Sequence, residues 1–394
     1  MTKFTEVAAG TDDESLIRRE NPLYERTREI RNPFVRDYTR VLHSGAFRRL
    51  KHKTQVFFNI ANDHICTRME HVLHVESVSA NIASALGLNS DLTRAIALAH
   101  DLGHAPFGHQ GETAIARLSR EYLGEAFTHE RHGLRTVDKL ELLEDNREIN
   151  RNLNLTYAVR DGIVSHCGEI DENNLVPRKE RGDLGMFSEE QPAQPSTWEG
   201  CVVKISDKIA YLGRDIEDAV NLGFLTEDSR KRLRKIAGNI NTTVIMYNMI
   251  NDICDNSDPG KGIALSREGV EQLDEIKRFN YEHIYKNPRF EPYKAYCGLV
   301  LTQLFEYLKP FYDGENTIAG LRESVESPHN PKFLRNFYEW LPKFCEGETV
   351  RRYENAKLYS LANERDYIRA ILDFISGMTD RYAVDCFNEL ITYS

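Results

Sequence analysis

The sequence contains no long apolar segment. No run approaches the roughly eighteen apolar residues that a membrane-spanning helix needs. The first twenty residues are polar and acidic, without the apolar stretch of a signal peptide. These absences argue against an integral membrane protein and predict a cytoplasmic location. Internal repeats and low-complexity tracts are absent as well, so the sequence favours an ordinary globular chain.

Cysteine occurs in a pattern that supports neither a disulfide framework nor a zinc site. The seven cysteines are odd in number, scattered, and contain no C-x-x-C pair, so we expect them to be small buried hydrophobic residues. Positive charge is also in deficit, because 51 lysines and arginines face 61 acidic residues and leave a net charge of −10. This balance argues against a surface that generally coats nucleic acid. A local basic patch at 48–53 can still face a phosphate substrate, or it is simply a solvated helix face.

Strict alternation of apolar and polar residues is rare in the chain, so an extended sheet is not predicted. Apolar residues at steps of three and four predict helices instead. The clearest helices are 67–87, which ends at Gly87, a segment after Asn89 that is apolar nearly all round, and 199–223. The other predicted helices are 37–58, 112–123, 130–143, 155–166, 226–254, 264–285, 291–311, 330–345 and 350–392. The predicted fold class is all-α.

Three consecutive regions are expected along the chain. Residues 1–35 are polar and rich in turn signals, so they form an N-terminal arm. Residues 36–225 form a helical core, and residues 226–394 form a C-terminal helical region. Within the core, residues 171–197 lose helical periodicity and are predicted to be a long exposed loop, of the kind that is usually functional or disordered.

The stretch from His100 to Glu112 carries the strongest chemical signal. Three histidines, one aspartate and one glutamate fall within thirteen residues, where a strongly apolar helix runs into a Gly/Pro turn. A charge delivered into the interior must be paired or metal-bound. At the fraying end of a helix, adjacent His100 and Asp101 can converge on one cation. Imidazole with carboxylate suits Mn²⁺, Fe²⁺, Mg²⁺ or Zn²⁺.

Further metal ligands must come from other helices. His71 and Asp207 are the best candidates, but on spacing alone His74 competes for the first position and Asp215 or Asp218 for the second. A lone histidine on a helix is more often structural than a ligand, and 199–223 alone is also compatible with an amphipathic surface helix. The balance shifts towards function because seven of the thirteen histidines lie between residues 71 and 132.

Six motifs along the chain can be compared with known families: Ala46 to Phe57, Arg68-x-x-His71, His100 to Glu112, Phe127 to Glu130, Ile205 to Tyr211 and Ile375 to Ala383. Together they resemble the HD-domain superfamily and, more closely, its deoxyguanosine-triphosphate triphosphohydrolase branch. The resemblance covers most of the chain, and the string from His100 to Glu112 is its most specific part.

The resemblance implies an HD-domain helical bundle at 36–225 and a C-terminal helical region that completes the site and an oligomer interface. It also implies three sets of site residues. The metal ligands would be His71, His100, Asp101 and Asp207. The catalytic residues would be His104, His109, Glu112 and His129. The residues that contact substrate would be Gln55, Arg68, Lys208, Tyr211 and Asp215.

The implied reaction is the hydrolysis of a deoxynucleoside triphosphate to deoxynucleoside and tripolyphosphate, with Mn²⁺ or Mg²⁺, or Fe²⁺, as cofactor. We hypothesise that His109, oriented by Glu112, protonates the leaving 5′ oxygen or assists the group that does. Tyr211 or Gln55, and more distantly Tyr382, are candidates to exclude a ribose 2′ hydroxyl.

The resemblance further implies a homo-oligomer, a hexamer or tetramer, with an activating nucleotide as a further partner. Single-stranded nucleic acid is a separate candidate partner that the resemblance does not imply. Two alternatives remain open. One is another HD phosphohydrolase, namely a nucleotidase, a phosphodiesterase or a (p)ppGpp hydrolase. The other is a nucleotide sensor or single-strand nucleic-acid binder. Base preference, the metal used in cells and oligomer size are not encoded in any pattern of the sequence that we recognise.

Overall fold

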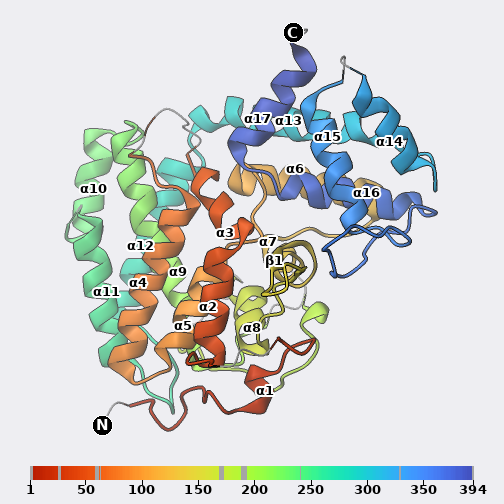
Figure 1. The fold of residues 1–394 in the computed structure, drawn as a ribbon. Coiled ribbons are helices and arrows are strands. Elements are labelled where there is room, and N and C mark those ends of the chain that lie inside the picture. Colours follow the sequence, from red (N-terminus) through yellow and green to blue (C-terminus); the bar gives the residue numbers. More distant parts are fainter. Residues whose placement is uncertain are drawn as a thin grey trace. The chain divides into compact units, whose positions relative to one another are not determined.

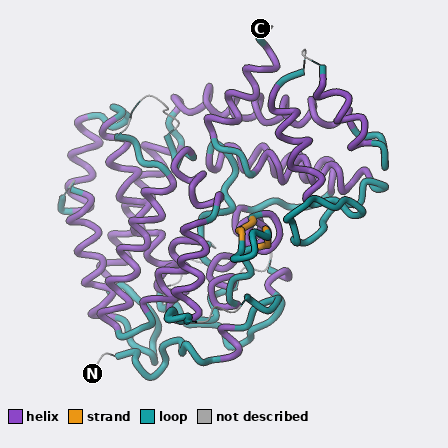
Figure 2. The backbone as a smooth tube through the Cα atoms, viewed as in Figure 1, coloured by secondary structure: helices purple, strands orange, loops and turns teal. Residues whose placement is uncertain are grey.

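Helices make up nearly all of the regular structure. The computed structural model describes residues 3–24, 28–57, 62, 64–167, 173–187, 193–239, 241–327 and 330–392. Within these ranges the only strands are β1 (Leu142–Glu144) and β2 (Asn150–Asn152), which pair antiparallel with Leu142 opposite Asn152 (Figure 2). The all-α prediction is therefore confirmed. No helix in the described part of the chain has both the length and the apolar character required to cross a bilayer.

Two compact units divide the chain, and each is assembled from segments that are distant in sequence. The first contains Met1–Leu42, Asn59–Asp101 and Asn154–Glu291, and the second contains His43–Phe58, Leu102–Leu153 and Pro292–Ser394. One boundary falls inside the central motif, between Asp101 and Leu102. This division differs from the three consecutive regions expected from the sequence, whose boundaries stay a prediction.

The first unit is built around three helices, α4 (Arg68–Leu86), α5 (Ser90–Ala99) and α9 (Trp198–Asn221), which pack against one another (Figure 1). Thr67 and Glu70 form a capping box that begins α4, and Gly87 ends it in the left-handed conformation, with φ 83°. The other helices of this unit are α1 (Glu14–Ile17), α2 (Pro33–His43), α8 (Tyr157–Ser165), α10 (Glu227–Ala237), α11 (Thr242–Asn256) and α12 (Arg267–Asn280). A π-helical turn, Tyr281–Tyr285, extends α12.

Helix α5 lies in the interior of the first unit, as its apolar sequence predicts. Asn89 caps it by accepting from the backbone N–H groups of Asp91 and Leu92, and all of its residues from Leu92 to Ala99 except Arg94 are buried. Helix α8 approaches it closely at Gly162, where a Cβ would lie 2.4 Å from Cγ2 of Ile96. This packing delivers the end of α5, with His100 and Asp101, into a buried position.

The second unit has its own apolar core, in which α6 (Gly108–Leu123) packs against α16 (Glu364–Ser376) (Figure 1). Its buried centre includes Leu304, Phe305, Phe337 and Tyr367, and the Tyr367 hydroxyl donates to the carbonyl of Leu308 at 2.8 Å. The other helices are α3 (Gly45–Arg49), α7 (His129–Arg135), α13 (Glu291–Leu308), α14 (Thr317–Glu326), α15 (Lys332–Trp340) and α17 (Asp380–Ile391), with a 3₁₀ turn, η1 (Leu50–His52), after α3.

Two predicted helices are broken by local capping. The segment 37–58 divides at Ser44, whose side chain accepts from the backbone N–H of Phe47 and so begins α3 after α2 has ended at His43. Phe58 lies outside the described residues. The segment 226–254 divides at Gly238, with φ 69°, between α10 and α11.

Other differences follow from tertiary packing. Residues 350–392 contain two helices, since α16 begins only at Glu364 and Gly377 separates it from α17. The segment 130–143 is helical to Leu140 and then enters β1. Helix α14 was not predicted. In the predicted loop 171–197 the described residues hold one 3₁₀ turn, Leu184–Met186, before α9 begins at Trp198, and residues 171–172 and 188–192 lie outside the described ranges.

Candidate metal centre and histidine cluster

Three helices of the first unit bring the candidate metal ligands together. His71 comes from α4, His100 and Asp101 from the end of α5, and Asp207 from α9. Nε2 of His71 lies 3.0 Å from Oδ1 of Asp207, and Nε2 of His100 lies 3.6 Å from Oδ1 of Asp101 and 3.8 Å from Oδ1 of Asp207. Donor atoms around a cation with bonds of about 2.1 Å are separated by about 3 Å or more. Donor atoms of His71, His100 and Asp207 all lie within 4.8 Å of one another and so fit one metal ion, and the Asp101 carboxylate lies 3.8 Å from His71 and 3.6 Å from His100.

The hydrogen bonds of His100 leave its other nitrogen available as a ligand. Nδ1–H donates to the carbonyl of Ala97 at 2.7 Å, which fixes the tautomer and turns the lone pair of Nε2 towards the two carboxylates. Among the described residues, this buried Nε2 has no hydrogen-bond partner. A buried lone pair without a partner costs free energy, and a bound cation would satisfy it.

The charges of the centre suit a cation as well. Burial opposes ionisation of Asp207, but the hydrogen bond and charge of His71 outweigh it and lower the pKa of that carboxyl to about 2. Asp101 is held by Arg68, whose guanidinium donates to Oδ2 at 2.7 Å, with both side chains almost fully buried. Metal ligands must be deprotonated, and both carboxylates are stabilised in that form.

The residues that competed for these positions on spacing alone lie elsewhere in the same unit. His74 does not share this group of closely spaced donor atoms. Asp218 accepts from the backbone N–H of Cys66, and Asp215 accepts from the hydroxyl of Tyr285, which the sequence did not single out. Burial raises the pKa of each of these two carboxyls to about 7.

His166 is a further histidine of the centre that sequence reasoning missed. A ring nitrogen of His166 and donor atoms of His100 and Asp101 all lie within 4.8 Å of one another. The centroid of the His166 ring lies 4.9 Å from that of His100. It occupies the C-cap of α8 as His100 occupies the C-cap of α5, and its Nδ1 bonds the carbonyl of Ile163 at 2.7 Å. The signal available in the sequence was a second histidine at the end of a buried helix.

A cluster of three histidines and a glutamate lies in the second unit. Helix α6 carries His109 and Glu112, and His129 begins α7. Glu112 bridges the other two: Oε1 accepts from the backbone N–H of His129 at 2.7 Å and lies 3.0 Å from its Nδ1, while Oε2 lies 3.3 Å from Nδ1 of His109. The ring of His104 stacks on that of His129, with centroids 3.8 Å apart. All four predicted catalytic residues are thus brought together.

The four side chains differ in exposure, and the difference distinguishes their chemistry. The side chain of His109 is 69% exposed, whereas that of His129 is 8% exposed. Burial would raise the pKa of Glu112, but the charge of His129 and the hydrogen bonds from His109 and His129 hold it well below its ordinary value. Because His109 is exposed whereas His104 and His129 are buried, His109 is the histidine best placed to exchange a proton with a ligand.

Two glycines of the motif permit close backbone contacts. A Cβ at Gly103 would lie 2.0 Å from the carbonyl oxygen of His129, and one at Gly111 would lie 1.7 Å from the carbonyl oxygen of Pro106. Between them, Phe107 and Gly108 both have positive φ, 65° and 57°. The turn that carries His104 and begins α6 is consequently a tight structure that side chains at these glycines would disrupt.

We expect Gly111→Ala to lower the free energy of unfolding by about 3 kcal/mol, because the methyl group overlaps backbone that cannot move aside freely. Urea titration followed by circular dichroism measures the change. The matched control is Gly298→Ala in α13, where a Cβ meets nothing within 4 Å. There alanine should be neutral or stabilise by about 0.5–1 kcal/mol. Equal effects at both positions would contradict the steric argument.

The predicted substrate-contacting residues fall into different surroundings. Lys208 and Tyr211 of α9 line a small cavity of about 50 Å³ with Leu265 and Lys277. Arg68 is engaged with Asp101 and Asp215 with Tyr285, as described above. Gln55 is nearly buried in the second unit. In the basic run at 48–53, Arg49 pairs with Glu141 at 2.7 Å and Lys53 is buried, while Arg48, Lys51 and His52 are exposed.

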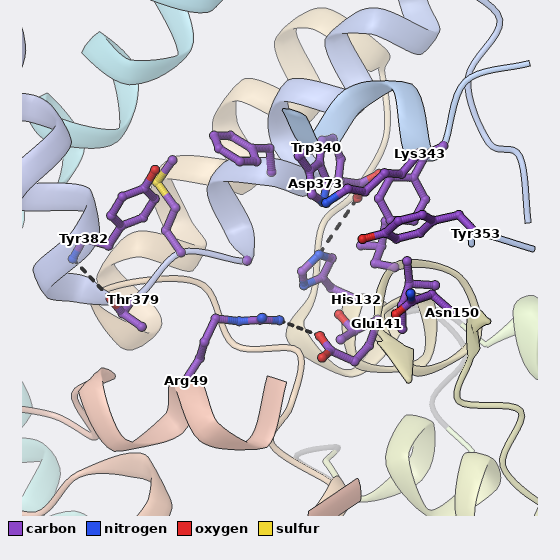
Figure 3. A pocket seen from close by; sticks show the side chains of 17 residues that line it. Arg49, His132, Glu141, Asn150, Trp340, Lys343, Tyr353, Asp373, Thr379 and Tyr382 are labelled. Carbon is purple, nitrogen blue, oxygen red and sulfur yellow. Dashed lines mark hydrogen bonds and ion pairs between the residues drawn. The ribbon is translucent and has the colours of Figure 1, made fainter. Parts of the chain in front are cut away.

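A larger cavity of about 440 Å³ lies in the second unit (Figure 3). Its wall combines aromatic side chains, among them Trp340, Tyr353 and Tyr382, with charged ones such as Arg49 and Lys343. The hydroxyl of Tyr382, the distant candidate for ribose exclusion, accepts from the amide of Asn336 at 2.6 Å. Apart from Tyr382, none of the residues predicted to bind metal, catalyse or contact substrate lines this cavity.

His132, at the edge of this cavity, should make stability depend on pH. Its Nδ1–H donates to the carbonyl of Gly103 at 2.8 Å, and burial lowers its pKa from 6.5 to about 4. The unfolded chain therefore binds a proton between these values that the folded chain does not. The stabilisation that comes from keeping His132 neutral is fully present above pH 6.5. As the pH falls towards 4 it is lost, and the free energy of unfolding decreases by about 3 kcal/mol in all.

The measurement is the free energy of unfolding as a function of pH for the wild type and His132→Asn. Asparagine retains a donor for the Gly103 carbonyl but does not titrate in this range. The difference between the two proteins should shrink from pH 7 to pH 4. Parallel curves would show that His132 titrates normally in the folded state.

Comparison with known proteins is consistent with this geometry. A family model described as the HD domain matches residues 68–212, and one described as the phosphohydrolase-associated domain matches residues 337–389. The protein is thus an HD-domain phosphohydrolase, one of a class of metal-dependent hydrolases, and it has histidine and aspartate groups that can hold a metal.

Three relatives carry the name deoxyguanosinetriphosphate triphosphohydrolase-like protein. The one from Caldanaerobacter subterraneus subsp. tengcongensis is 36% identical over 92% of this chain and 86% of its own length. Those from Desulfatibacillum aliphaticivorans and Clostridium perfringens are 35% and 32% identical, over 82% and 98% of this chain and 87% and 94% of their own. The chain belongs to this deoxyguanosinetriphosphate triphosphohydrolase-like family, as the motifs predicted.

Proposed function

We propose that the protein hydrolyses deoxynucleoside triphosphates, dGTP among them, to deoxynucleoside and tripolyphosphate. The observation that carries the proposal is the bridging of His109 and His129 by Glu112, three residues that the sequence motif assigned to this reaction. The names of the relatives supply the substrate class. The four ligand candidates in the first unit supply the metal centre that an HD hydrolase requires.

The ligand set proposed for the metal is His71, His100, Asp101 and Asp207. Two imidazoles and two carboxylates accept Mn²⁺ or Fe²⁺ readily and Mg²⁺ less so, because Mg²⁺ prefers oxygen ligands. When bound, such an ion withdraws charge from a phosphate and lowers the pKa of coordinated water. Arg68 keeps the Asp101 carboxylate in place for this role.

The histidine cluster is proposed to serve the same reaction. Only Leu102 and Gly103 stand between Asp101 and His104, so the covalent chain limits their Cα separation to about 11 Å. His109 donates a proton to the departing 5′ oxygen, and Glu112 fixes the orientation of its ring. His104 and His129, held face to face, bind phosphate oxygens. Lys208 and Tyr211 bind the rest of the nucleotide beside their small cavity, together with Gln55 and Asp215.

The alternatives from the sequence differ in their products. A phosphodiesterase, a nucleotidase or a (p)ppGpp hydrolase with the same metal ligands would not release intact tripolyphosphate. A nucleotide sensor or single-strand nucleic-acid binder would release no product at all. Assembly into a homo-oligomer, a hexamer or tetramer, and activation by a second nucleotide remain part of the proposal.

The decisive experiment is product analysis. The purified protein is incubated with Mn²⁺ or Mg²⁺ and each dNTP or NTP, singly and as a mixture of dNTPs, and nucleosides and phosphates are separated by ion-exchange chromatography. Deoxynucleoside with tripolyphosphate in equal amounts supports the proposal. Orthophosphate or pyrophosphate as first product, or no turnover even in the mixture, rejects it.

A further inference from the structure

The turn between His104 and α6 is held by a residue from the C-terminal end of the chain. Asp380, the first residue of α17, is 4% exposed. Its Oδ1 accepts from the backbone N–H of Phe107 at 2.8 Å, and its Oδ2 accepts from the backbone N–H of Thr54 at 2.8 Å and from the Thr54 hydroxyl. One buried carboxylate therefore joins the segment after η1, the catalytic turn and α17, all within the second unit.

A buried lysine reinforces the same turn. Lys53 is 3% exposed, and its ammonium group donates to the carbonyl of His104 and, at 3.2 Å, to the carbonyl of Ser376 at the end of α16. Burial raises the pKa of Asp380, and the hydrogen bonds from Thr54 and Phe107 and the charge of Lys53 oppose that rise. Two buried side chains of opposite charge type, Lys53 and Asp380, thus contact the backbone at the two ends of the stretch His104 to Phe107. We call this pair of side chains the clamp.

The clamp acts where the backbone is least favourable. Phe107 is the N-cap of α6, has φ 65°, and provides no side-chain cap. A phenylalanine adopts the left-handed conformation only when its surroundings enforce it. His109 follows two residues later and Glu112 five residues later, so the conformation at Phe107 sets the direction in which the first turn of α6 presents both side chains.

We propose that Asp380 and Lys53 are positioning residues for the hydrolytic reaction: they hold the Phe107 turn in its left-handed conformation and thereby place His104 and His109. This inference rests on the proposed function of the two histidines. It gives a role to the motifs around Lys53 and Asp380, which lie on either side of residues 68–212, the part of the sequence matched by the HD model. Of these two motifs, only Gln55 belongs to the residue sets assigned above.

A purely structural role is the alternative, because removal of a buried charged group leaves its hydrogen-bonding partners unsatisfied and destabilises a protein. The test therefore compares Asp380→Ala and Asp380→Asn with Glu389→Ala. Glu389 lies in the same helix α17, and its carboxylate likewise accepts a backbone N–H, that of Phe333, at 3.2 Å. Glu389 has no contact with the catalytic turn among the bonds of the described residues.

Steady-state kinetics with dGTP and hydrogen exchange of peptides covering residues 104–111 are measured on each full-length protein. Asp380→Ala should reduce kcat by about 10²-fold, the effect expected from displaced catalytic groups, with KM changed less than threefold and faster exchange at Phe107. Asp380→Asn, which retains one acceptor oxygen, should recover part of kcat. Glu389→Ala should leave kcat and exchange at Phe107 unchanged.

The outcomes separate the clamp from the proposed function. The positioning role is overturned if a folded Asp380→Ala protein has an unchanged kcat. It is also overturned if Asp380→Asn shows accelerated exchange at Phe107 but an unchanged kcat. If Asp380→Ala does not fold, Asp380→Asn and Lys53→Met decide on the same criteria. A wild type without dNTP hydrolysis rejects the proposed function and the positioning role with it. If the wild type hydrolyses dNTPs but hydrogen exchange at Phe107 is unchanged in Asp380→Ala and Asp380→Asn, the clamp alone is rejected.

Discussion

Replacement of Asp207 by asparagine should abolish metal binding and reduce hydrolysis by about 10³-fold or more, since the ion contributes several kcal/mol to transition-state stabilisation. The substitution preserves shape but removes the charge that lies 3.0 Å from His71 and 3.8 Å from His100. Metal content after dialysis against Mn²⁺, measured by inductively coupled plasma mass spectrometry, should fall from one ion per chain to near zero. Isothermal titration with Mn²⁺ should show the same loss without reference to activity.

The matched control for this substitution is Asp218→Asn on the same helix. Asp218 is more deeply buried than Asp207, but it accepts from the backbone N–H of Cys66 and does not share the group of donor atoms formed by His71, His100 and Asp207. It should retain a full complement of metal. Retention of metal by Asp207→Asn, or its loss in Asp218→Asn alone, would show that the ligand set has been assigned to the wrong carboxylate of α9.

Replacement of His109 by alanine should lower kcat by about 10²–10⁴-fold, the usual contribution of a general acid, while nucleotide binding is largely kept. The reason is the geometry of the cluster: His109 is exposed enough to meet a substrate, and Glu112, which orients it at 3.3 Å, also bonds His129. Binding of dGTP is measured in Ca²⁺ or another non-supporting ion, and turnover in Mn²⁺.

His52→Ala is the control, because His52 is an exposed histidine of the same unit outside the cluster. It should behave as the wild type in both assays. A His109→Ala protein that binds dGTP weakly but hydrolyses the bound nucleotide at the normal rate would assign His109 to binding and leave His129 as the candidate acid.

Much of the helical structure near the site follows from local sequence. The capping box at Thr67, the cap at Asn89 and the glycine at position 87 define α4 and α5 within a residue or two, because these signals act between neighbours in the chain. The pairing of His109 with Glu112, three residues later, was also expected from the sequence, although the helix was predicted to begin at Glu112 and begins at Gly108.

The breaks in the longer predicted helices illustrate the limit of periodicity. Residues 37–58 keep an apolar period across Ser44, yet the serine side chain competes for the backbone N–H of Phe47 and starts a new helix in another unit. In residues 350–363 the helical spacing of apolar residues is outweighed by tertiary contacts. Examples are the backbone hydrogen bonds that Leu358 and Tyr359 donate to the carbonyl of Phe344. Such contacts depend on partners that no window of sequence contains.

The sequence by itself determined the fold class, the family and the residues from which the site is drawn, because capping, apolar periodicity and a dense motif are local properties. Only the tertiary structure decided which of three aspartates on α9 faces His71, that Arg68 holds Asp101, that His166 joins His100, and that Asp380 reaches back 273 residues to the turn before α6. Each of these pairings joins segments far apart in the chain. They form only when packing has removed water from the groups involved, so their energies exist in the folded protein and not in the sequence pattern.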